Sequence, residues 1–267
     1  MLSSRQQHCL QGIGIRRWRE RDALPALEES DEQTTEAATS AEMPVAETAP
    51  AILSVPDSVE TVTAAPVPDV PVEEPELPRI DITALENWDG LHHAVEACQA
   101  CALAQNCTRK VPGVGDREAD LMIIGEGPGH DEDLRGEPFV GRSGQLLDRM
   151  LEAIGFSREQ VYITNIVKCR PPSNRDPRPE EARQCRAYLD AQIRQINPRI
   201  ILSAGRVSAH NLLESQQPVG KLIKQMHVLP GTDIPLKVTY HPAYLLRNPS
   251  AKAIAWQDMK LLYRMLQ

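Results

Sequence analysis

A loop rich in glycine and acidic residues spans residues 125–144, with the sequence GEGPGHDEDLRGEPFVGRSG. Glycines between a strand and a helix commonly form a cradle for phosphate, because backbone N–H groups can approach the anion closely. Glu126 and the run HDED at 130–133 oppose that interpretation, since their carboxylates would repel an anion. The loop is therefore a candidate ligand site whose charge does not suit phosphate, although the acidic run could also be a solvated surface.

Four cysteines have spacings that suit a metal centre. Cys98 and Cys101 form a C-x2-C pair, and Cys169 and Cys185 follow with fifteen residues between them. Four thiolates suit tetrahedral zinc or an iron–sulfur cluster, and the spacing alone does not choose between them. Buried cysteines without a metal are the simpler alternative. Cys107 is a possible fifth member of the set, and Cys9 lies outside the predicted core.

The elements that would position these residues alternate along the chain. Strands are predicted at 119–126, 161–167, 199–205 and 235–242, and helices at 143–155, 178–196, 206–215 and 250–266. This alternation predicts a single three-layer α/β domain over residues 80–267, with a central, mostly parallel sheet. Ligands bind at the carboxyl ends of such strands. Glu126, Asn165 and His241 all fall at or near those ends.

The first 79 residues have a different composition. Residues 26–79 contain eight prolines, no aromatic residue, and thirteen acidic residues against one arginine. Such a segment buries too little apolar surface to offset its ordering entropy, so we expect a disordered tether. The chain has no apolar run of 18 residues and no secretory signal, which excludes a membrane span and favours the cytoplasm.

Several long motifs together resemble the family 4 uracil-DNA glycosylases. They are CQAC at 98–101, VPGVGDREADLMIIGEGPGHDEDLRGEPFVGRSGQLLDRML at 111–151, VYITNIVKCRPPSNRDPRPEEARQC at 161–185 and HPAYLLRNP at 241–249. The resemblance covers about residues 90–267 and implies an α/β fold with a central parallel sheet. It also implies a [4Fe–4S] cluster on Cys98, Cys101, Cys169 and Cys185, and a monomer that acts on uracil-containing DNA.

The resemblance also assigns roles to individual residues. It implies that Glu126 is the acidic residue of the first active-site motif and that His241 belongs to the second. Phe139 matches the aromatic that stacks on the flipped uracil, and Asn165 matches the amide that reads the base. Gly127 stands where the related family 1 enzymes have a catalytic aspartate. For each of these residues, the residue type alone also allows a structural role, such as core packing for Phe139.

A separate departure from the family concerns Cys107, which stands where relatives often have arginine.

A glycosylase must flip its base out of the duplex, which costs a few kcal/mol. Leu245 and Leu246 are candidate apolar wedges for the gap, and Arg247 could hold a phosphate beside them. His241, neutral or charged, can donate to uracil O2 as negative charge develops. Glu126 can orient the attacking water or stabilise the cationic sugar, which gives the acid of the glycine-rich loop a function.

The N-terminal peptide 1–25 is basic and partly apolar. It resembles the N-terminal peptide of the psi subunit of the bacterial replicase clamp loader, through features that include Leu10, Ile15 and Trp18. The resemblance implies docking on a clamp-loader subunit, and a disordered basic tail is the alternative. Two functions follow: a uracil-excising repair enzyme tethered to the replisome, or a psi-like adaptor on a glycosylase scaffold with weak or no catalysis. The retained active-site residues favour the enzyme.

Overall fold

The computed structural model describes residues 85–267. The predictions for the peptide 1–25, with Leu10, Ile15 and Trp18, and for the linker 26–79 lie outside these residues and stay predictions. Within residues 85–267, no helix has both the length and the apolar character needed to cross a membrane.

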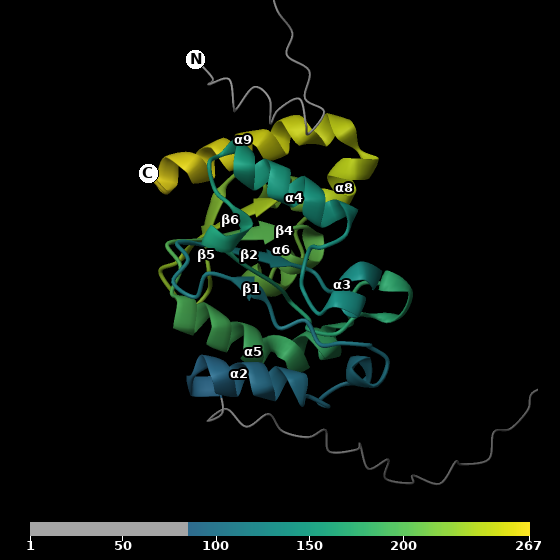
Figure 1. Ribbon diagram of the computed structural model, residues 1–267. Helices are drawn as coiled ribbons and strands as arrows, with labels where there is room; N and C mark the ends of the chain where they lie inside the picture. Colours follow the sequence, from purple (N-terminus) through teal and green to yellow (C-terminus); the bar gives the residue numbers. More distant parts are fainter. Residues whose placement is uncertain (1–84) are drawn as a thin grey trace, which may run out of the picture. The chain divides into compact units, whose positions relative to one another are not determined.

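Six strands form one sheet in the order β1-β3-β2-β4-β6-β5 (Figure 1). The pairs β2–β3, β2–β4 and β4–β6 are parallel, whereas β1 and β5 join the edges antiparallel. The prediction of a mostly parallel sheet is confirmed, and the four predicted strands correspond to β2, β3, β4 and β6. The bounds are β1 Val114–Gly115, β2 Leu121–Gly125, β3 Tyr162–Asn165, β4 Ile200–Ala204, β5 Met226–Val228 and β6 Pro235–Thr239.

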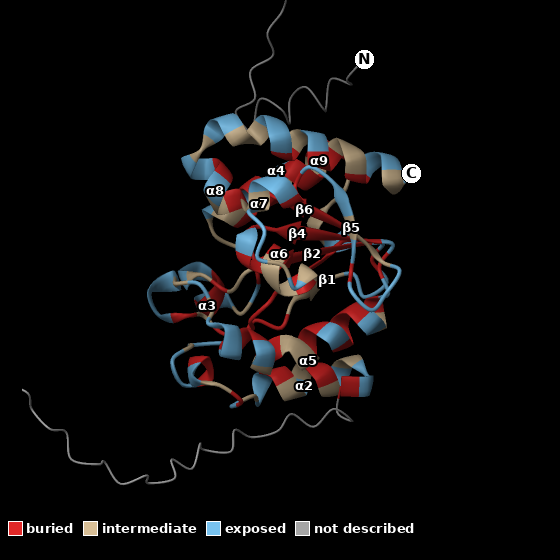
Figure 2. Cartoon of the chain, turned by 180° about the vertical axis from the view of Figure 1, so that it is seen from behind, coloured by how far each residue is buried: buried red, intermediate tan, exposed pale blue. Residues whose placement is uncertain are grey.

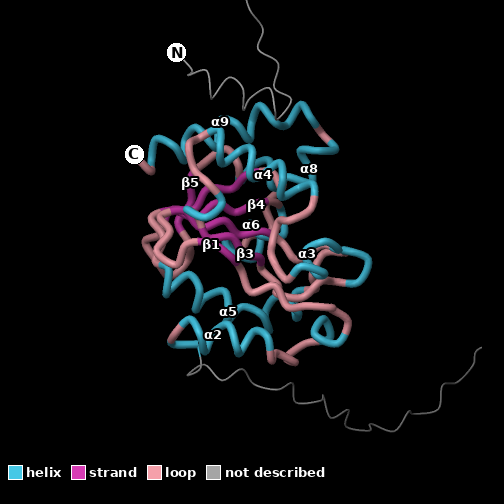
Figure 3. Tube along the Cα trace, viewed as in Figure 1, coloured by secondary structure: helices cyan, strands magenta, loops and turns pink. Residues whose placement is uncertain are grey.

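Helices cover both faces of the sheet, as predicted for three layers (Figures 1 and 3). One face is covered by α4 (Arg142–Ala153), α8 (Pro242–Arg247) and α9 (Lys252–Met265). The other is covered by α2 (Trp88–Glu96), α5 (Pro179–Ile196), α6 (Arg206–Leu213) and α7 (Val219–Leu222). The short helix α3 (His130–Arg135) follows β2. Short 3-10 turns occupy Ala102–Gln105, Arg158–Gln160, Pro172–Asn174 and Pro249–Ala251.

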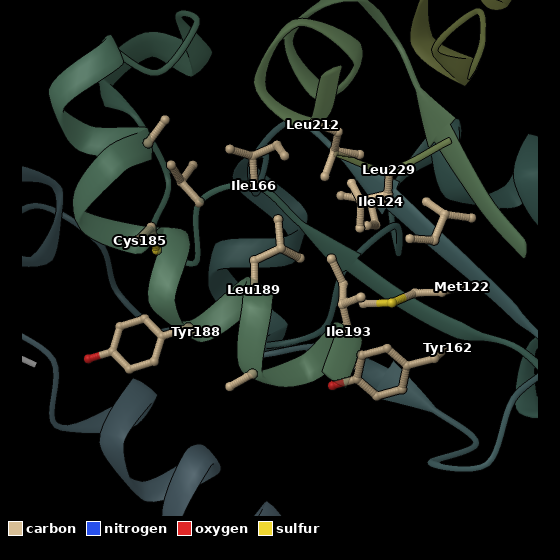
Figure 4. Close-up of a cluster of buried hydrophobic side chains, with 14 of the residues drawn as sticks. Met122, Ile124, Tyr162, Ile166, Cys185, Tyr188, Leu189, Ile193, Leu212 and Leu229 are labelled. Atoms are coloured by element: carbon tan, nitrogen blue, oxygen red, sulfur yellow. The ribbon is translucent and has the colours of Figure 1, made fainter. Parts of the chain in front are cut away.

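Two apolar cores lie on opposite faces of the sheet, because successive side chains of a strand point to opposite sides. In β2, Met122 and Ile124 belong to one core, and Leu121 and Ile123 to the other. Figure 4 shows Met122 and Ile124 among the residues of the first core, and Figure 2 shows the buried central strands. All four side chains are fully buried, so the sheet is a rigid base for the loops at its ends.

The limits of α5 follow from its sequence. Pro179 begins the helix, where its missing N–H is no loss. Glu181 accepts the backbone N–H of Arg178 at 2.7 Å, which satisfies a donor at the helix start. The helix ends at Asn197, which adopts a left-handed conformation. These signals fix where Cys185 sits on the helix.

The central strands end at one edge of the sheet. Gly125 of β2 pairs with Asn165 of β3, and Ala204 of β4 pairs with Thr239 of β6. The loops that follow these four residues therefore begin side by side. This edge is where the sequence predicts the site.

Candidate active site

A cavity of about 740 Å³ opens at the carboxyl edge of the sheet. It brings together predicted site residues from four separate segments: Glu126, Gly127, Phe139, Asn165, His241 and Arg247. Further polar and aromatic residues line it that the sequence did not single out: Asn174, Arg175, Asp176, Arg206, Tyr240 and Tyr244. The cavity therefore combines flat aromatic surface, hydrogen-bonding groups and charges of both signs.

Glu126 follows β2 directly and is half-buried in the cavity wall. Its Oε1 accepts the backbone N–H of Val207 at 3.4 Å. Burial raises the pKa of this carboxyl above its ordinary value, and the charge of Asp176 adds to the effect, while nearby arginines oppose it. A side chain at position 205 would collide here, since a Cβ on Gly205 would lie 2.7 Å from Glu126 Oε1 and 3.0 Å from His241 Cβ.

Phe139 has a left-handed backbone, with φ of 53°, and its side chain is buried. A non-glycine residue in this conformation costs about 1–2 kcal/mol, so its neighbours must hold it. Arg158 does so from one side, donating to the carbonyl oxygens of Pro138 and of Phe139, the latter at 3.1 Å. Asp148 accepts from the same guanidinium at 3.1 Å.

Glu132 holds the Phe139 loop from the other side. Its carboxylate accepts the N–H groups of Val140 and Gly141, both at 3.0 Å, and that of Gly129 at 3.1 Å. It thus ties the loop after β2 to the loop that carries the aromatic ring. Asp133 is also buried and accepts the N–H of Thr108 at 2.8 Å. The alternative of a solvated surface is therefore wrong for these two acids of the HDED run.

Asn165 ends β3 and is 2% exposed. Its amide lies next to Gly125 and close to the ring of Phe139. A Cβ on Gly125 would lie 2.4 Å from Asn165 Oδ1 and 2.6 Å from the Phe139 ring. Glycine at position 125 is therefore required for the amide and the ring to share one wall of the cavity.

His241 caps the N-terminus of α8 and lies beside Phe139, with the two ring centroids 5.4 Å apart and the rings 28° from coplanar. Its Nδ1 accepts the backbone N–H of Ala243 at 3.1 Å. An acceptor nitrogen carries no proton, so this hydrogen bond assigns the ring proton to Nε2. Burial, together with the charge of Arg247, lowers the pKa of His241 to about 4. The imidazole is therefore neutral at pH 7 and has one N–H to donate.

The two leucines predicted as wedges differ in position. Leu245 is 1% exposed and packs in the core beneath α4 and α9, whereas Leu246 is 37% exposed. The two leucines point in different directions because they are neighbours in a helix, so Leu246 alone of the two is exposed, and the wedge role stays a prediction. Arg247 lines the cavity next to them.

The segment 171–177 closes another side of the cavity and was not predicted to do so. Asn174 has φ of 53°, and its Oδ1 accepts from Arg170 at 2.8 Å. Asp176 forms an ion pair with Arg206, which links this segment to α6. Prolines and polar residues in PPSNRDP indicate a turn, but turn signals carry no information about which cavity the turn borders.

The four predicted metal ligands also come together, in a second, small cavity. Cys98, Cys101, Cys169 and Cys185 line it with Lys168 and Tyr188. All four are free thiols. Backbone N–H groups donate to two of the sulfurs, from Ala100 to Cys98 at 3.5 Å and from Lys168 to Cys185 at 3.4 Å. Within residues 85–267, no group of three or more Cys, His, Asp or Glu is arranged to hold a single metal ion.

Cys107 lies beside this set. Its thiol donates to the carbonyl oxygen of Ala104 at 3.7 Å, and Lys110 Nζ donates to its sulfur at 3.3 Å. The neighbouring Cys169 and Lys110 lower the pKa of Cys107 to about 6. Cys107 is thus a neighbour of the predicted ligand set, although it does not line the cavity itself.

Lys168 connects the two cavities. Its side chain is 1% exposed, and Nζ donates to Asn165 O at 2.9 Å and to Thr164 Oγ1 and Gln192 Oε1, both at 2.7 Å. Burial lowers its pKa to about 8. The ammonium thus holds the end of β3, one residue before Cys169 and three after Asn165.

Comparison with known proteins gives consistent matches. Residues 112–260 match the family model of the uracil DNA glycosylase superfamily. The type-4 uracil-DNA glycosylase of Archaeoglobus fulgidus is 40% identical over 182 residues, which cover 66% of this chain and 92% of the relative. That of Saccharolobus solfataricus is 41% identical over 183 residues, covering 66% and 85%. That of Thermotoga maritima is 43% identical over 158 residues, covering 58% and 81%.

Proposed function

The chain belongs to the uracil DNA glycosylase superfamily, and we infer that it is a DNA repair enzyme that hydrolyses the bond between uracil and deoxyribose in DNA. The observation that carries this inference is the meeting of an aromatic ring, an amide, an imidazole and a carboxylate in one cavity. The relatives named above are glycosylases by name, so the comparisons give no support to a clamp-loader adaptor.

Recognition of the base is assigned to Phe139 and Asn165. The ring of Phe139 provides a flat apolar surface for the flipped uracil. The Asn165 amide donates to uracil O4 and accepts from N3–H. Cytosine presents the opposite pattern at those two atoms, so it would leave the buried amide unpaired.

Bond cleavage is assigned to His241 and Glu126. When the C1′–N1 bond breaks, its electron pair moves to uracil, and the oxygen of a water forms the new bond to C1′. The proton that this water loses neutralises the released uracil anion by way of the solvent. The neutral imidazole donates Nε2–H to uracil O2 as negative charge develops there. The Glu126 carboxylate stabilises the positive charge on the sugar and orients the water.

Contacts with the DNA outside the cavity are assigned to α8. Leu246 is exposed and apolar, which suits a wedge that fills the space left by the flipped nucleotide. Arg247 follows it and can contact a phosphate.

A [4Fe–4S] cluster on Cys98, Cys101, Cys169 and Cys185 is part of the proposal. Its support is the donor set, since four free thiols around one cavity suit iron–sulfur ligation. When bound, the cluster would link the segment after α2, α5 and the segment after β3, and so would act structurally. The backbone N–H of Lys168 donates to Cys185 Sγ, and the charge of its buried ammonium favours the thiolate form of Cys185.

Uracil release from labelled oligonucleotides, single- and double-stranded, tests the proposed function. We expect the protein to release uracil, and His241→Ala and Asn165→Ala each to slow release by roughly 100-fold or more, as loss of a preorganised transition-state contact does. Both variants should keep the Tm of the unmodified protein. His93→Ala, in an exposed position on α2, is the matched control and should be unaffected.

Failure of the unmodified protein to release uracil from any substrate would contradict the function. Rates near those of the unmodified protein in both active-site variants would contradict the residue assignments alone.

A further inference from the structure

Two tyrosines form a stacked pair on the wall of the cavity, one on either side of His241 in the sequence. Tyr240 follows β6, and Tyr244 lies in α8. Their ring centroids are 4.9 Å apart and their planes differ by 24°. Both residues line the cavity, and no step of the proposed reaction uses either of them.

The pair is anchored on one side and open on the other. Tyr240 is half-buried and packs against both apolar cores, so its ring has a fixed place. Tyr244 rests on it and is 38% exposed. An exposed aromatic ring whose orientation is already fixed needs little ordering when a flat ligand stacks on it.

The size and charge of the cavity indicate a ligand larger than one base. Pockets of roughly 300–1,000 Å³ hold drug-sized ligands with several rings, and this cavity has a volume of about 740 Å³. Arg206 and Arg247 line it as well, and cations beside an aromatic ring are the groups that hold the backbone of single-stranded nucleic acid.

We propose that Tyr244, supported by Tyr240, stacks on an unpaired nucleobase next to the flipped uracil on the same strand. This inference rests on the proposed function, since it extends the substrate from one nucleotide to two. The neighbouring base is covalently joined to the bound nucleotide and so reaches the ring at a high effective concentration. In a duplex that base stays paired and stacked, so the contact forms on single-stranded DNA.

The test compares two changes, one in the protein and one in the substrate. Single-stranded oligonucleotides carry one uracil, with either normal neighbours or an abasic analogue on the 5′ or the 3′ side. Tyr244→Ala should lower kcat/KM on the normal strand by roughly 5- to 150-fold, the range that stacking of about 1–3 kcal/mol per base gives. The abasic neighbour, on the side that stacks, should lower kcat/KM of the unmodified protein by a similar factor.

The two losses should not add. On the strand with the abasic neighbour, Tyr244→Ala and the unmodified protein should be equally active, because that strand has no base at this position for either protein to stack on. Tyr244→Phe keeps the ring and should behave as the unmodified protein does. On duplex DNA, the loss caused by Tyr244→Ala should be much smaller than on the single strand, and an unchanged Tm shows that the variant is folded.

Independent, multiplicative losses would overturn the proposal, as would an unchanged Tyr244→Ala on single strands. If the unmodified protein released no uracil at all, the proposed function would fail by itself. Fluorescence anisotropy with the same oligonucleotides would then decide the stacking question, since equal affinity of Tyr244→Ala and the unmodified protein would overturn it.

Discussion

The uracil cavity and the cysteine cavity are joined by five consecutive residues but are built differently. Asn165 faces the first and Cys169 the second, with the buried ammonium of Lys168 on the carbonyl of Asn165. The uracil cavity is assembled from loops that follow several strands. Burial raises the pKa of Glu126 and lowers that of His241 in this cavity. The cysteine cavity lies between packed helices and belongs to the apolar core. From this contrast we expect that substitutions in the uracil cavity can abolish activity without lowering stability, whereas substitutions in the cysteine cavity lower stability.

The largest expected effect comes from the cysteine side. Cys169→Ser should abolish the iron content and the visible absorption of the purified protein and lower Tm by roughly 10 °C or more, because metal binding energy is folding energy. Iron analysis and thermal unfolding measure both changes. His241→Ala, by contrast, should keep iron and Tm. A zinc-loaded, iron-free protein that is folded and fully active would contradict the cluster.

A glycine on the cavity side should give an intermediate effect. A Cβ on Gly144 would lie 1.7 Å from the carbonyl oxygen of Phe139, so Gly144→Ala must move the backbone that carries the ring. We expect kcat/KM to fall by roughly 100-fold, as a displacement of about 1 Å in a substrate-positioning group does. Gly220→Ala in α7 is the matched control, since its Cβ would meet only the Tyr240 hydroxyl at 3.9 Å. Equal activity of the two variants would show that Phe139 is not held as described.

The smallest effect concerns pH. Burial raises the pKa of Glu126, so the active carboxylate is lost at a higher pH than for an ordinary glutamate as the solution is acidified. Single-turnover rates should therefore decline on the acid side, and Glu126→Gln should be slower but lack that decline. An acid limb that survives in Glu126→Gln would assign it to another group.

Stability, measured by urea unfolding at each pH, should also fall in acid, because of His241. Its pKa is lower in the folded protein, about 4 against 6.5, so the unfolded chain binds more protons between these values. His241 thus costs no stability above pH 6.5, and it lowers stability progressively as pH falls toward 4.

The sequence predicted the positions of the reacting groups better than their supports. Glu126, Asn165 and His241 could be placed because strand ends of a parallel sheet meet at one edge. Glu132 was not recognised as buried, since its role depends on backbone N–H groups that only the fold brings near. Leu245 and Leu246 are identical in type, and only the start of α8 at Pro242 decides which of them is buried. The edge strands, two and three residues long, are too short for a periodic pattern.

Those edge strands also bear on self-association at high concentration. The fully buried strands β2 and β4 would pair with strands of other molecules if their backbone N–H and C=O groups faced solvent. Each of them has a neighbouring strand on both sides instead. The outer positions are taken by β1, which is two residues long, and by β5, whose exposed Met226 and Val228 flank a single further residue. A strand of a second molecule could form only a few backbone hydrogen bonds with either edge. Edge-to-edge pairing of sheets into fibres is therefore disfavoured.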